Sequence, residues 1–201
     1  MPPLMVFEYD GDTNKLLEYV SNIEYHDSIG NIKSKSDYIL DGKELSGLKK
    51  FCLESVQEYV FDVLGIDDEI EIQQSWINVN KPGQNHPEHY HGNSFISGVF
   101  YLYSEQKEGS PITFKSELHK SNFSILTVPK DPFANYYPSI AGSFSYPSIP
   151  GELILFSSTT THLVPTNNSN EVRISLSFNT YPKIPFGSKE NLTHVRESKL
   201  K

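Results

Sequence analysis

Four side chains in this sequence have the types and the spacing to form a metal site beside an anion-binding site. His89 and His91 are two residues apart, His162 lies far along the chain, and Arg173 follows it closely. Imidazole binds Fe, Zn, Cu and Ni alike, so these ligands alone do not select the metal. A guanidinium binds a carboxylate through two parallel hydrogen bonds. The pattern therefore predicts a metal ion with a carboxylate bound next to it.

The close histidine pair follows a turn at Pro87. Residues two apart on a strand point to the same face, so His89 and His91 can converge on one ion. The alternative is a histidine-rich surface loop, because His86 lies in the same stretch. His86 and Glu88 are expected at solvated loop positions. His162, considered alone, is a weak candidate, because single histidines at strand ends are more often structural.

The segment between His162 and Arg173 favours a turn. It contains the run Pro-Thr-Asn-Asn-Ser-Asn at 165–170. A hairpin centred near 167–168 places His162 directly opposite Arg173, with Cβ atoms about 5 Å apart. Ser175 shares the face of Arg173 and adds a hydroxyl. The alternative for Arg173 is a surface ion pair.

The periodicity of apolar residues predicts helices first and strands afterwards. A helix is expected from Asp41, where Asp41 and Glu44 form a capping-box pattern, to a stop at Gly65, and a weaker helix over 14–22. From residue 69 onward the period changes to two, with strands predicted at 70–81, 95–103, 112–114, 123–128, 153–156 and 172–178. Short, regularly punctuated antiparallel strands indicate a mainly β jelly roll, with the N-terminal helices packed on one sheet.

Two of these strands have a polar face where a plain sandwich has core. In the last strand, Arg173, Ser175, Ser177 and Asn179 alternate with apolar residues. In the first strand, one face is expected to hold Ile70, Ile72, Trp76, Asn78 and Asn80, opposite Ile77 and Val79. The two polar faces predict a barrel with a polar mouth.

Composition limits the classes of partner and compartment. The net charge of -8 argues against nucleic acid, which needs clustered lysine and arginine. The single cysteine, Cys52, excludes an intrachain disulfide, and no run reaches the roughly 20 apolar residues of a membrane span. The N-terminus lacks a signal-peptide pattern, so a cytoplasmic protein is expected. One domain is expected over 1–201, with helical support at 1–69, a β core at 70–181 and a polar tail at 182–201.

The ordered set of motifs resembles a known family. The run from Asn80 to His91, the strand Ser-Gly-Val-Phe-Tyr-Leu at 97–102, the segment 151–162 and Arg-Ile-Ser at 173–175 resemble the 2-oxoglutarate and Fe(II)-dependent dioxygenases of the double-stranded β-helix fold. The likeness is greatest to small bacterial and phage members and covers about residues 70–180.

The resemblance implies roles for individual residues and a reaction. His89 matches the first iron ligand and His162 the distal one, while Arg173 and Ser175 match the anchor of the 2-oxoglutarate C5 carboxylate. Two positions depart from the family pattern, because His91 stands where a carboxylate is usual and Asn80 where a tyrosine is common. Asn80 can still donate a hydrogen bond to a carboxylate.

The implied cofactors are Fe(II) and 2-oxoglutarate, with dioxygen as the oxidant and hydroxylation of a substrate as the outcome. Asn78 is a further candidate for co-substrate binding, and no catalytic side chain is expected beyond the metal centre.

The substrate is expected to be a small molecule or a peptide. The segment 129–150 is long, aromatic and rich in proline, as functional lids often are. Trp76, Tyr136, Tyr137 and Phe144 are candidate substrate contacts. The alternative is that these aromatic residues cover the edge of a sheet.

Two other functions remain open at this point. One is a cupin-type dioxygenase or isomerase with three histidines that does not use 2-oxoglutarate. The other is a non-catalytic β-sandwich that serves as a binding module. Arg173 and Ser175 distinguish the first from a 2-oxoglutarate enzyme, and metal uptake distinguishes the second. The sequence does not predict the oligomeric state.

Overall fold

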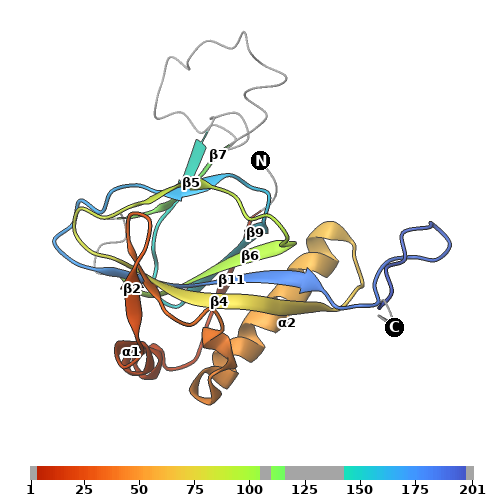
Figure 1. Cartoon of the computed structure of the whole chain (residues 1–201), viewed down its shortest axis with the longest axis horizontal. Coiled ribbons are helices and arrows are strands. Elements are labelled where there is room, and N and C mark those ends of the chain that lie inside the picture. The colour runs from red at the N-terminus through yellow and green to blue at the C-terminus, as the bar shows by residue number, and fades with distance from the viewer. Residues whose placement is uncertain (1–3, 105–109, 116–142, 198–201) are drawn as a thin grey trace, which may run out of the picture.

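Two antiparallel sheets face each other in the computed structural model, which describes residues 4–104, 110–115 and 143–197 (Figure 1). Among these residues the larger sheet has the strand order β1-β9-β6-β11-β4-β3-β2 and the smaller sheet the order β5-β10-β7-β8. The strands of the larger sheet are β1 (Met5–Glu8), β2 (Tyr25–Asp27), β3 (Ile32–Ser34), β4 (Ile70–Asn80), β6 (Ile96–Ser104), β9 (Glu152–Ser157) and β11 (Arg173–Pro182). Those of the smaller sheet are β5 (His86–His89), β7 (Ile112–Lys115), β8 (Ser143–Tyr146) and β10 (His162–Val164). This is the predicted double-stranded β-helix.

Two helices cover the outer face of the larger sheet, as expected (Figure 1). They are α1 (Thr13–Ser21) and α2 (Ser46–Leu64). The main core lies between these helices and the sheet, and its fully buried members include Leu48, Cys52, Val56, Tyr59, Ile77, Phe100, Leu153 and Leu176. With this face of the sheet filled by apolar side chains, the opposite face is left for the polar residues.

The start of α2 differs from the predicted capping box. Two short 3-10 turns, η1 (Ile39–Asp41) and η2 (Lys43–Leu45), precede the helix, whose N-cap Leu45 makes no side-chain cap hydrogen bond. Asp41 instead forms an ion pair with Lys49, at 2.7 Å between Oδ1 and Nζ. The predicted C-terminal stop is confirmed, because Gly65 has φ of 65° and its N–H donates to Phe61 and Val60.

A bulge between β11 and β4 corrects the predicted faces of β4. The register pairs Asn179 with Gln74 but Thr180 with Ile72, so β4 has one extra residue there. An extra residue reverses the facing of everything beyond it. Ile70 and Ile72 therefore pack in the helix-side core with Ile77, and not on the face of Trp76.

The N-terminal 69 residues, expected to be helical support, also contribute three strands. β1 pairs with β9 at one edge of the larger sheet, and β3 pairs with β4 while β2 forms the other edge. The hairpin of β2 and β3 thus lies beside the strand that holds Asn78. The strand predicted at 123–128 falls outside the described residues. No helix in the described part of the chain is both long and apolar enough to cross a membrane.

The predicted hairpin between His162 and Arg173 is wrong. β10 lies in the smaller sheet and β11 in the larger one, so His162 pairs with His89 and Arg173 with Asn80. Asn167 accounts for the difference. Its side-chain Nδ2 donates to the Asn80 carbonyl at 3.0 Å, and its backbone bonds Gly83 and Gln84. The segment is thereby fastened to the loop after β4 and crosses between the sheets.

Candidate functional site

Three histidines from two neighbouring strands and a loop meet between the sheets. The ligand atoms of His89, His91 and His162 all lie within 4.8 Å of one another. The ring centroids of His89 and His162 are 4.3 Å apart, and that of His91 is 5.0 and 5.2 Å from theirs. The structure therefore brings together all three residues that the sequence predicted as metal ligands.

The backbone positions each of these side chains. β10 pairs antiparallel with β5 so that His162 is directly opposite His89. The backbone N–H of His91 donates to the Ser158 carbonyl at 2.9 Å, which holds the loop beyond β5 against the end of β9. Trp76 of β4 lies beside His91, with the centroids of the two rings 6.0 Å apart.

Two backbone carbonyls fix which ring nitrogen is free. Nδ1 of His89 lies 2.8 Å from the Pro87 carbonyl oxygen, and Nδ1 of His162 lies 2.9 Å from that of Thr160. A carbonyl only accepts, so in both rings Nδ1 carries the proton and donates. Nε2 then keeps its lone pair for a metal, which is the usual arrangement of metal-binding histidines.

Burial also keeps His162 and His91 neutral. Desolvation, followed by the effect of the neighbouring His89, lowers the pKa of His162 to about 3. Desolvation and the same neighbour lower the pKa of His91 to about 4. Both imidazoles therefore offer an unprotonated nitrogen at neutral pH.

Arg173 is a buried cation whose surroundings are polar but not acidic. It is 3% exposed. Its Nε donates to Ser148 at 2.9 Å, and Nη1 donates to Ser175 at 3.0 Å and to Asn80 at 3.4 Å. Its guanidinium carbon lies 5.0 Å from the centroid of the Tyr101 ring. Among the described residues Arg173 has no carboxylate partner, so its charge is available to an anion.

The two asparagines predicted to bind co-substrate have different surroundings. Asn80 is 1% exposed, and its Nδ2 has no hydrogen-bond partner in the described part of the chain. An unpaired buried donor beside a guanidinium suits a carboxylate. Asn78 is instead bonded within the protein: its Nδ2 donates to Ser177 at 3.0 Å and its Oδ1 accepts from Asn31 at 3.2 Å.

One cavity of about 210 Å³ joins these groups. It is lined by all three histidines, by Arg173 and Ser175, by Asn78 and Asn80, and by Trp76. Phe144 does not line it and packs instead against a small core formed by residues of β6, β7 and β9. Tyr136 and Tyr137 lie outside the described residues, as does most of the predicted lid. The described end of that segment forms strand β8.

Sequence reasoning missed four residues of this site. His86, expected in a solvated loop, lines the cavity with its ring 4.5 Å from that of His89. Ser148 is fully buried and bonds Arg173. Asn31 and Lys33 come from β3 and the turn before it, a segment with no sequence signal for a site. Only His86 had a usable signal, because it precedes His89 in the same short strand.

The comparisons with known proteins identify the family. Residues 74–179, more than half of the 201-residue chain, match the family model described as "Putative 2OG-Fe(II) oxygenase". The chain belongs to this family, and it is a 2-oxoglutarate-dependent non-haem iron oxygenase with Fe(II) and 2-oxoglutarate as cofactors. A search of curated protein sequences gives no match.

Solved structures support the fold. The epimerase SnoN from nogalamycin biosynthesis, in complex with Fe3+, alpha ketoglutarate and nogalamycin RO, is 13% identical with a TM-score of 0.63, over 89% of this chain and 78% of that one. HygX from Streptomyces hygroscopicus, with nickel, 2-oxoglutarate and hygromycin B bound, is 9% identical with a TM-score of 0.62, over 90% and 83%. A prolyl hydroxylase from Trichoplax adhaerens, in complex with a hypoxia inducible factor peptide, is 12% identical with a TM-score of 0.62, over 91% and 85%.

The residues of the cavity fit the cofactors of the family. Three imidazoles suit Fe(II), and a guanidinium without an acidic partner among the described residues, next to an amide donor without a partner there, suits a carboxylate of 2-oxoglutarate. Family membership decides against the two alternatives that the sequence left open, a dioxygenase that does not use 2-oxoglutarate and a non-catalytic module.

Proposed function

We propose that this protein is a hydroxylase that couples oxidative decarboxylation of 2-oxoglutarate to hydroxylation of a small molecule or a peptide. The observation that carries the proposal is Arg173, a buried cation without an acidic partner among the described residues, in the same cavity as three histidines. A buried charge is costly unless it is paired. A dicarboxylate between the guanidinium and the histidines supplies that pairing.

The residues of the site have different parts in this scheme. His89, His91 and His162 would hold Fe(II), which when bound supplies the redox chemistry with dioxygen. Arg173, Ser175 and Asn80 bind the far carboxylate of 2-oxoglutarate and so orient its other end toward the histidines. Ser148 and Tyr101 hold the guanidinium in place. All three residues are buried, which strengthens these charge contacts.

Succinate formation from 2-oxoglutarate and Fe(II) in air tests the proposal, because slow turnover without substrate is measurable. We expect the native chain to form succinate and His162→Ala to form it at least tenfold more slowly, since the variant removes one of three ligands. His194→Ala, which changes a histidine outside the cavity, is the matched control. Absence of succinate from the folded native chain, or equal rates in His162→Ala, would contradict the proposal.

A further inference from the structure

The cavity holds two cationic side chains and no acidic ones among its described lining residues. The cations are Arg173 and Lys33, and the remaining polar lining consists of histidines, asparagines and serines. This contrasts with the chain as a whole, which has a net charge of -8. A cavity lined by one sign of charge attracts ligands of the opposite sign.

The two cations lie at different places and serve different ligands. Arg173 pairs with Asn80 on one side of β4, and Lys33 pairs with Asn78 on the other side. Strands two apart are separated by roughly 10 Å. The two cations share no hydrogen-bond or ion-pair partner among the described residues, so we assign Lys33 to another group than the carboxylate bound to Arg173.

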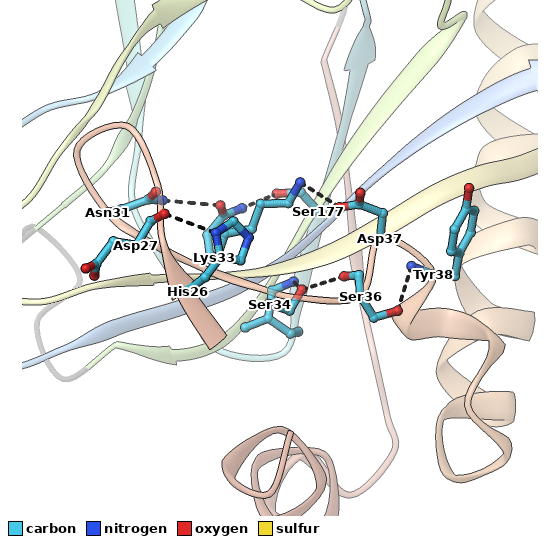
Figure 2. A network of polar contacts seen from close by, with 11 residues as sticks. His26, Asp27, Asn31, Lys33, Ser34, Ser36, Asp37, Tyr38 and Ser177 are labelled. Carbon is cyan, nitrogen blue, oxygen red and sulfur yellow. Dashed lines mark hydrogen bonds and ion pairs between the residues drawn. The ribbon is translucent and has the colours of Figure 1, made fainter. Parts of the chain in front are cut away.

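Lys33 is held in position on the side of the cavity that Trp76 forms. Its Nζ lies 5.2 Å from the centroid of the Trp76 ring. The same atom lies 2.6 Å from Oδ1 of Asp37, as Figure 2 shows. The Asp37 side chain is 44% exposed and does not line the cavity. Asp37 binds the ammonium from outside the cavity, where solvent screens the carboxylate charge. Two of the three ammonium protons stay available to a ligand.

Charge balance in the loaded site leaves this ammonium without an anion inside the cavity. The two charges of Fe(II) and the two of the 2-oxoglutarate dianion cancel, so Arg173 and Lys33 carry the remaining charge of the cavity, which Asp37 offsets only in part and from outside it. His91 accentuates the imbalance, because a neutral imidazole stands where a carboxylate is usual in such sites. A substrate anion at Lys33 would reduce the excess positive charge.

Asn31 adds a second unfilled polar position beside Lys33. It is 2% exposed and lines the cavity, and its Oδ1 has no hydrogen-bond partner among the described residues. Its Nδ2 donates to Asn78, which fixes the amide so that Oδ1 is the free atom. A ligand group with an N–H or O–H next to its anion would satisfy both residues.

We propose that the substrate carries a carboxylate, on a small molecule or at the end of a peptide, which Lys33 binds beside the face of Trp76. The proposal rests on the proposed function, because it assigns Arg173 to 2-oxoglutarate. Lys33 is then a specificity-determining residue: it selects anionic substrates and directs the adjoining part of the substrate toward His91, which contacts Trp76.

Trp76 provides a direct measurement, because it is the only tryptophan of the chain. Its fluorescence is followed under nitrogen, with Fe(II) and saturating 2-oxoglutarate, during titration with hippurate and with its neutral amide, hippuramide. N-acetylglycine and N-acetylglycinamide form a smaller matched pair. We expect each carboxylate to bind at least tenfold more tightly than its amide, and the preference to disappear in Lys33→Met and to return in Lys33→Arg.

Lys35→Met is the matched control, since Lys35 is an exposed partner of Glu24 and does not line the cavity. It should keep the preference for carboxylates. The proposal is overturned if neither carboxylate is preferred by the native chain, if Lys33→Met keeps the preference, or if the preference is found only without 2-oxoglutarate, which would place the anion at Arg173. Failure of the proposed function would show separately, as absence of succinate formation by the native chain.

Discussion

Two backbone carbonyls give the histidine cluster its chemistry. The Pro87 and Thr160 carbonyls accept from Nδ1 of His89 and His162 and leave Nε2 free. The three histidines were predictable from the sequence, because histidine is a common metal ligand and two of them are spaced to share one face of a strand. The sequence could not predict these acceptors, since they depend on the turn before each histidine. It also could not predict that His91 is packed against Trp76.

Replacement of Arg173 should affect 2-oxoglutarate binding more than any other single change of the anion site. Arg173→Met removes a buried charge and all the hydrogen-bond donors of the guanidinium, a loss of about 2–5 kcal/mol, so the Kd should rise 30-fold or more. Arg173→Lys keeps the charge but loses the planar guanidinium. Its Kd for 2-oxoglutarate should therefore lie between those of the native chain and Arg173→Met. Calorimetric titration with 2-oxoglutarate, under nitrogen and with Fe(II), measures the effect.

The exposed Arg196 supplies the control, because Arg196→Met makes the same change outside the cavity. It should bind 2-oxoglutarate as the native chain does. An unchanged Kd in folded Arg173→Met would show that the dicarboxylate binds elsewhere.

Alternation along a strand shows which residues share a face, but not which strand lies next to it. The polar face of β11 was predicted correctly, and Arg173, Ser175 and Ser177 line the cavity. The predicted strand partner of His162 is wrong, because the Asn-rich segment resembles a hairpin turn although His162 pairs with His89. Tertiary hydrogen bonds from Asn167 to the loop after β4 override that local preference. His162 and Arg173 still share one cavity, but from opposite sheets.

The floor of the cavity depends on a close approach between β6 and β11. Gly98 is paired with Phe178, and a Cβ at Gly98 would overlap the Phe178 ring. Phe178 is fully buried in the core, so its ring has little room to move. Gly98→Ala should therefore lower the free energy of unfolding by about 1–3 kcal/mol, as overpacking does. Urea denaturation measures the change.

Gly92→Ala is the control for this substitution, because a Cβ at Gly92 meets no atom within 4 Å. It should leave the free energy of unfolding within about 0.5 kcal/mol of the native value. Equal free energies of unfolding for the two variants would mean that the Phe178 ring moves aside without loss of stability.

Across the whole molecule, charge is distributed so that the acidic groups stay out of the cavity. The chain has 25 acidic and 17 basic residues, yet the described lining of the cavity has only cations, histidines and neutral groups. The acidic composition argued against nucleic acid as a partner, but it did not indicate that the cavity itself is positively charged. Asn31 and Lys33 reach the cavity from the N-terminal part of the chain, and only the pairing of β3 with β4 brings them there.

Burial of neutral histidines in the cavity should make the stability of the metal-free protein depend on pH. Burial lowers the pKa of His162 to about 3 and that of His86 and His91 to about 4. The unfolded chain takes up these protons near pH 6.5, so below that pH it binds more protons than the folded chain. The stabilisation is therefore complete above pH 6.5 and is lost as the pH falls toward these lowered values.

The contribution of His162 can be isolated by comparison with His162→Gln. One such imidazole contributes roughly 1.4 kcal/mol per pH unit, so between pH 6.5 and 5 the native chain should lose about 2 kcal/mol more than the variant. Groups that titrate alike in both proteins cancel in this difference. Urea unfolding of chelator-treated protein at pH 7 and pH 5 measures it. Parallel losses in the two proteins would mean that His162 is protonated as easily in the folded chain as in the unfolded one, and that the cavity does not keep it neutral for a metal.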